Sequence, residues 1–176
     1  MRLITKTFFA FGTIGIAILT GTMAAAATGQ SASDAQAPLL EDYVYPGADG
    51  ILATYGVKLI AGDGHILFID CTTPPDGNVG AIEVRTSAKI GANKKGVICF
   101  KVTAATGHLE LMVPAVYEIH GDGLIAGSGH KVKAALTTDA GEHTSVNVDP
   151  NGSTPVGVGS KPGAAPTTLL QLDVAP

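Results

Sequence analysis

Hydrophobic and polar residues alternate with a period of two along much of the chain, which is the pattern of a half-buried β-strand. Ile82 and Val84, for example, alternate with Glu83 and Arg85. Successive side chains of a strand point to opposite faces, so such a segment has one apolar and one polar face. We therefore predict strands at 57–61, 65–71, 81–87, 97–103, 108–113, 116–120, 130–136, 143–148, 154–158 and 167–174.

Turn-forming residues separate these segments. Gly62-Asp63-Gly64 can close a hairpin because glycine adopts positive φ without steric strain. Residues 139–142 and 149–153 are similar in composition. Short, regularly spaced strands without a long amphipathic helix are typical of an all-β fold. We predict an antiparallel β-sandwich, Ig-like or jelly-roll-like, with a small barrel as the alternative.

Two segments depart from simple alternation. Residues 65–71 (HILFIDC) are apolar on both faces through Ile69, as expected for a central strand that is covered on both sides. In the segment 48–55 (ADGILATY), the apolar side chains fall on one helical stripe and Gly56 follows as a C-terminal stop. A short helix at 48–55 would supply the cover, and an additional strand there is the alternative.

The N-terminal sequence predicts export. Basic residues Arg2 and Lys6 precede an apolar segment at 8–23 and four alanines at 24–27, which together form a signal peptide at 1–27. An uncleaved signal anchor is the alternative. Residues 28–41 are small and polar and predict a flexible leader, and 42–176 form a single domain. We expect a secreted protein that is free of the membrane after cleavage.

Composition excludes several classes of protein. The chain is 15% charged and 45% hydrophobic, which argues against a charge-rich disordered chain. Loss of Arg2 and Lys6 with the signal peptide changes 11 basic and 15 acidic residues to 9 and 15. Such an acidic surface does not attract nucleic acid or anionic lipid. The chain has 0 Trp, which counts against a stacking platform for sugars.

Both cysteines lie in the part of the chain that would be exported. An even pair in an oxidising compartment predicts one disulfide, Cys71–Cys99. The loop that it closes would stabilise the fold by about 3.5 kcal/mol through chain entropy. Free thiols with redox or metal-binding roles are the alternative, although these roles favour closer spacing such as C-x-x-C.

The histidines offer one candidate metal site. If residues 114–116 form a hairpin loop, Glu110 lies opposite His120 on the outer face and His108 lies diagonal to them. Two imidazoles and a carboxylate can coordinate zinc. Exposed strand faces often carry His and Glu without binding metal, so we favour the absence of a metal or other cofactor. His108, Glu110 and His120 remain the alternative.

Other motifs predict turns and no catalytic residue. Gly-Asp-Gly occurs at 62–64 and at 121–123, which we interpret as two independent turns. Oxygen-bearing residues at 149, 151 and 153 resemble a calcium loop, but Gly152 occupies the wrong loop position. Ser128 and His130 are close in sequence, yet the chain has no G-x-S-x-G nucleophile motif.

The segments GDGHILFIDC at 62–71, ICF at 98–100 and TPVGVG with TLLQLDV near the C-terminus resemble a group of small exported actinobacterial β-sandwich proteins. The resemblance covers most of the chain from about residue 46. That group has no assigned activity, so the resemblance implies a fold and a compartment but no catalytic residue. The low aromatic content and a stabilising disulfide are also similar to exported chromophore-binding sandwiches, although this chain departs from that family in having only one pair of cysteines.

We therefore expect a non-catalytic extracellular protein, a binding or cell-surface or matrix-associated module with an extracellular or cell-wall ligand. A small-ligand carrier of the exported sandwich type is the second hypothesis. A metal-dependent hydrolase that uses His108, Glu110 and His120 is the third.

Overall fold

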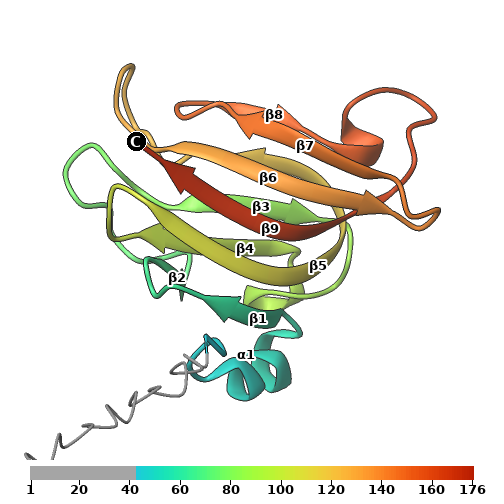
Figure 1. Ribbon diagram of the computed structural model, residues 1–176, viewed down its shortest axis with the longest axis horizontal. Coiled ribbons are helices and arrows are strands. Elements are labelled where there is room, and N and C mark those ends of the chain that lie inside the picture. Colours follow the sequence, from blue (N-terminus) through green and yellow to red (C-terminus); the bar gives the residue numbers. More distant parts are fainter. Residues whose placement is uncertain (1–42) are drawn as a thin grey trace, which may run out of the picture. The chain divides into compact units, whose positions relative to one another are not determined.

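The computed structural model of the protein describes residues 43–176 (Figure 1). The predicted signal peptide at 1–27 and the predicted leader at 28–41 lie outside these residues. No helix within 43–176 is long and apolar enough to cross a membrane. The helix and strands of the described part are α1 (Ala48–Tyr55), β1 (Lys58–Gly62), β2 (Ile66–Ile69), β3 (Ile82–Thr86), β4 (Val97–Val102), β5 (Gly107–His120), β6 (Lys131–Thr138), β7 (His143–Val148), β8 (Ser153–Pro155) and β9 (Thr167–Ala175).

These strands form one open, mostly antiparallel sheet. Seven of them follow the order β2-β4-β3-β5-β9-β6-β7, while β1 and β8 pair with β5 outside this path. The path ends at β2 and at β7 and does not close on itself, so the barrel alternative is wrong. The predictions of an antiparallel all-β fold and of one short helix at 48–55 are confirmed.

The 14-residue strand β5 connects the two halves of the sheet. Its first half pairs with β1 and β9, and its second half pairs with β3 and β8. Alternate side chains of β5, including Leu109, Leu111 and Val113, are fully buried. They pack in one hydrophobic core with buried residues of β9, such as Leu169 and Leu172.

The predicted hairpin at 114–116 is wrong, because 108–113 and 116–120 belong to one continuous strand. The register shifts between Val113 and Val116, and Ala115 adopts a φ of 52°. Proline lacks a backbone N–H and interrupts a strand ladder, so a bulge at this point keeps the strand continuous. The side chain of Thr86 donates a hydrogen bond to the Pro114 carbonyl oxygen at 2.5 Å and supports the bend.

The prediction that 65–71 is a central strand is also wrong, since β2 lies at one edge of the sheet. Its apolar character has a different cause. The ring of Phe68 is covered by Tyr55 of α1, with ring centroids 4.9 Å apart, and also contacts Phe100 of β4. The Tyr45 hydroxyl accepts a hydrogen bond from the Phe68 backbone at 2.7 Å. A side chain that would otherwise face solvent is therefore covered by residues from the N-terminal part of the domain.

The helix α1 ends as the sequence predicts. Gly56 has a φ of 70°, and its N–H donates to the Leu52 carbonyl oxygen. The left-handed conformation is accessible to glycine without strain, and the bond satisfies a carbonyl group at the helix end.

The disulfide Cys71–Cys99 is present, as predicted, with a Cα–Cα distance of 5.2 Å. Cys99 lies in β4 and Cys71 lies just after β2, so the bond ties the start of the β2–β3 loop to an interior strand.

We expect the double variant Cys71→Ala/Cys99→Ala to lose about 2–4 kcal/mol of unfolding free energy, since the bond closes a loop with a sequence separation of 28. Urea denaturation of the variant and of the oxidised wild type measures the difference. The wild type treated with reductant should behave like the variant. A variant as stable as the oxidised protein would contradict the expectation.

Candidate functional site

The predicted metal candidates His108, Glu110 and His120 do not meet in the structure. His108 Nε2 lies 3.6 Å from Glu110 Oε1, but His120 lies at the far end of β5. There its Nδ1 donates to the Gly121 carbonyl oxygen at 2.7 Å. The pairing of Glu110 with His120 is wrong because it depended on the hairpin at 114–116. Within residues 43–176, no three His, Cys, Asp or Glu side chains are arranged to hold a metal ion.

His108 lies between two carboxylates on the half-exposed face of β5 and β9. Its Nδ1 is 2.7 Å from Asp173 Oδ1, and Gln171 Nε2 donates to Asp173 Oδ2 at 2.6 Å. The hydrogen bond with Asp173 raises the pKa of His108, partial burial opposes this shift, and the charges of Asp173 and Glu110 add to it. This arrangement stabilises the polar face of the sheet.

The raised pKa predicts a pH-dependent contribution of His108 to stability. A group whose pKa is higher in the folded state stabilises the fold fully below its unfolded pKa of about 6.5, and the effect is lost as the pH rises through the folded pKa. We expect His108→Gln to lower the unfolding free energy by less than about 1 kcal/mol at roughly pH 5, because the pair is half-exposed.

At about pH 9 the same variant should have almost no effect. Urea denaturation at both pH values measures the difference, and His143→Gln on the exposed part of β7 is the matched control. A loss of equal size at both pH values would show that the protonated form of His108 has no stabilising role.

The structure brings together a second pair, Asp122 and His130, that the sequence analysis did not identify. The side chain of Asp122 is 0% exposed and that of His130 is 25% exposed. Asp122 Oδ1 accepts a hydrogen bond from the backbone N–H of His130 at 2.8 Å, and Oδ2 lies 2.6 Å from His130 Nδ1. A carboxylate accepts hydrogen bonds, so we assign the ring proton to Nδ1. In the neutral ring, Nε2 is then the acceptor.

Close packing of glycines places Asp122. A Cβ atom at Gly121 would collide with the carbonyl oxygens of Asp149 and Pro150, and Gly129 adopts a φ of 84° beside the backbone of Gly123. The Gly123 N–H donates to the Pro150 carbonyl oxygen at 2.7 Å. Larger residues at Gly121 or Gly129 would push the turns at 121–123 and 149–153 apart and move the Asp122 carboxylate.

The turn at 149–153, which resembles a calcium loop in sequence, supports this packing. Its side chains bond within the protein. Asp149 Oδ1 accepts from the Asn151 N–H at 3.0 Å, and Asn151 Nδ2 donates to the Ser128 carbonyl oxygen at 3.0 Å. Asn151 Nδ2 also donates to the Ile125 carbonyl oxygen. The turn therefore ties the segment before His130 to the loop that follows β7.

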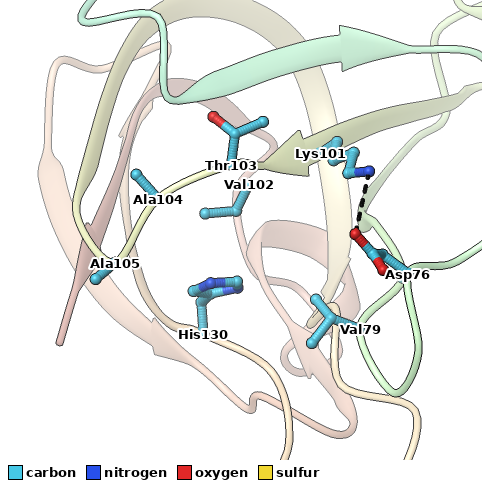
Figure 2. Close-up of a pocket in the computed structure, with 9 residues that line it drawn as sticks. Asp76, Val79, Lys101, Val102, Thr103, Ala104, Ala105 and His130 are labelled. Carbon is cyan, nitrogen blue, oxygen red and sulfur yellow. Dashed lines mark ion pairs between the residues drawn. The ribbon is translucent and has the colours of Figure 1, made fainter.

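A cavity of about 400 Å³ opens beside His130 (Figure 2). Its walls come from the end of β4 and the loop after it, from the β2–β3 loop and from the residue before β6. On its solvent-exposed side, Lys101 Nζ lies 3.9 Å from Asp76 Oδ2. The apolar lining residues are Val79, Val102, Ala104 and Ala105, and the polar side chains are those of Asp76, Lys101, Thr103 and His130.

One signal in the sequence could have indicated this pair. The two Gly-Asp-Gly triplets look alike, but only the second is followed by Gly-Ser-Gly-His. Asp63 of the first triplet accepts a bond from His65, two residues further on, whereas Asp122 of the second bonds to a residue eight positions away. His130, at the end of this segment, therefore bonds to Asp122 and not to the neighbouring Ser128.

Comparison with known protein-family models and with curated proteins finds no match for this chain. The assignment of the site therefore depends on the geometry of Asp122, His130 and the cavity beside them.

We expect Asp122→Ala to lower the unfolding free energy by about 1–3 kcal/mol, because it leaves two partly buried donors of His130 without their partner. Urea denaturation measures the loss. Asp139→Ala removes a carboxylate from the exposed turn after β6 and should change stability by no more than about 0.5 kcal/mol. Equal effects of the two substitutions would show that the buried carboxylate does not stabilise the fold.

Proposed function

We propose that this protein is a binding protein that holds a small ligand in the cavity beside His130. The observation that supports the proposal is the orientation of the His130 ring. Asp122 is buried and bonds to both the backbone and Nδ1 of His130, so Nε2 remains as a fixed acceptor on a residue that lines the cavity. Fixing a group in its bound orientation before binding reduces the entropy lost on association.

The size and lining of the cavity also support this function. Small-molecule sites typically measure about 300–1,000 Å³ and combine apolar walls with a few placed polar groups. The cavity of about 400 Å³ has apolar side chains such as Val79 and Val102 beside His130 and Thr103. Such a lining suits a ligand with a small apolar body and a hydrogen-bond donor.

We further propose that the protein is exported and belongs among the small exported actinobacterial proteins that its sequence resembles. The predicted signal peptide at 1–27 and the disulfide Cys71–Cys99 support export, since disulfides persist in oxidising compartments. An intact mass beginning at Thr28 for protein from the culture medium tests it.

We also propose a sandwich in which β1-β5-β9-β6-β7 and β2-β4-β3-β5-β8 are two layers that share β5, as the alternating burial along β5 suggests.

A carrier for a larger ligand is the second candidate. A cavity of about 530 Å³ lies between β6, β7 and the segment 155–167. Its lining includes Val156, which is buried, and Val146, which packs against the core. A ligand here would lie at the other end of β6 from His130, so the two candidates can be separated by mapping where a ligand binds.

We expect His130→Ala to weaken binding of any ligand of the first cavity at least about tenfold, which corresponds to one lost hydrogen bond of roughly 1.4 kcal/mol. Ligand-observed NMR with a library of small polar molecules identifies the ligand, and isothermal calorimetry measures its affinity. His143→Ala removes an exposed imidazole on β7 and serves as the control. Unchanged affinity in His130→Ala would contradict the proposal.

The variant Asp122→Asn tests more sharply whether the same ligand binds through Nε2 of His130. The amide oxygen can accept from the His130 N–H, but the amide NH₂ group then donates to Nδ1 and moves the ring proton to Nε2. We expect a folded protein that no longer accepts a hydrogen bond from the ligand. Long-range proton–nitrogen NMR of the ring reports the tautomer. Wild-type affinity together with a reversed tautomer would exclude Nε2 as the binding atom.

A further inference from the structure

We propose that the ligand is a small zwitterion of the amino acid or dipeptide class, and this inference rests on the proposed binding function. Its carboxylate would bind Lys101 and its ammonium group would bind Asp76. These two residues and His130 carry the only titratable side chains that line the cavity within the described part of the chain. Both charged side chains line the cavity, and the ion pair between them contributes little to the stability of the protein.

The ion pair between Lys101 and Asp76 is loose. Lys101 Nζ and Asp76 Oδ2 are 3.9 Å apart, and the two side chains are 37% and 85% exposed. Water screens such pairs, and they contribute little to stability. A ligand that separates the two side chains therefore gives up little protein stability.

A zwitterion fits this pair better than an ion of one sign. A simple anion that approaches Lys101 is repelled by Asp76, and a simple cation that approaches Asp76 is repelled by Lys101. An amino acid carries its ammonium and carboxylate groups on one carbon atom. It can therefore replace one protein ion pair by two ion pairs with the ligand, and it leaves neither protein charge without a partner.

The rest of the cavity accommodates the remainder of such a ligand. Figure 2 shows the Lys101–Asp76 pair on one side and His130 on another, with the side chains of Val79 and Val102 between them. The apolar side chains would pack against the ligand's aliphatic part. Nε2 of His130 would accept a hydrogen bond from an N–H or O–H group at its far end, such as a hydroxyl, an amide or the peptide N–H of a dipeptide.

The backbone on both sides of the cavity is held in place before a ligand binds. The β2–β3 loop, which carries Asp76, begins at the disulfide. The Asp76 N–H donates to the Val79 carbonyl oxygen at 2.8 Å, and the Gly80 N–H donates to the Asp122 carbonyl oxygen at 2.6 Å. Lys101 lies on β4, which is an interior strand. The loop that carries Asp76 is thus bonded to Asp122, the partner of His130, and Lys101 is carried by a strand that is paired on both sides.

Calorimetry with a panel of free amino acids and dipeptides tests the proposal. Each compound is compared with its N-acetyl form, which lacks the ammonium charge, and with its C-terminal amide, which lacks the carboxylate. In the wild type we expect each modification to weaken binding tenfold or more. Asp76→Asn should abolish the discrimination against the N-acetyl form, and Lys101→Met should abolish the discrimination against the amide.

Matched controls remove a charge elsewhere. Lys95→Met and Asp139→Asn change exposed residues outside the cavity, and both should keep the wild-type discrimination. The proposal is overturned if the blocked compounds bind as tightly as the zwitterions, or if no zwitterion binds at millimolar concentration. If another class of ligand then binds in a His130-dependent way, the proposed function stands and only the zwitterion assignment fails. If no ligand of any class depends on His130, both fail.

Discussion

The hydrogen-bond ladder of β5 is the interaction on which the rest of the structure depends. A strand in the middle of a sheet has two edges whose polar groups need partners, and β5 satisfies them with four different strands. This is possible because the bulge at Ala115 changes the direction of the strand partway along. The core residues of both halves of the sheet are therefore positioned by one continuous segment.

The candidate site is built at the end of this strand. Asp122 is the second residue after β5 and His130 is the last residue before β6, so their contact closes the connection between two strands that both pair with β9. The β2–β3 loop and the turn after β7 pack on the same connection through hydrogen bonds of Gly80 and Gly123. The cavity walls thus have separate attachments to the rest of the domain, which hold the backbone around the cavity in place.

The sequence predicts the features that depend on local pattern. It does not predict the features that depend on contacts between residues far apart in the chain. Strands such as β3 and β6 alternate cleanly because one face is buried and the other is solvated. The disulfide was predictable because two cysteines allow only one intramolecular bond. Pro114 gives the same local signal in a turn and in a bulge, and only pairing with β9 distinguishes them. Asp122 and His130 form no periodic pattern; the Gly-Ser-Gly-His sequence after the second triplet marks the segment, but only the fold identifies Asp122 as the partner of His130.

The chemical identity of residue 122 argues for a role beyond holding two turns together. Burying a carboxylate is unfavourable compared with burying a neutral amide, and an amide could also bond to the backbone N–H of His130. The carboxylate differs in one respect: it only accepts hydrogen bonds, so it requires a proton on Nδ1, and in the neutral ring this leaves the lone pair on Nε2. A carboxylate at this position therefore determines which polar atom His130 presents to the cavity. The proposed ligand would donate its hydrogen bond to this atom.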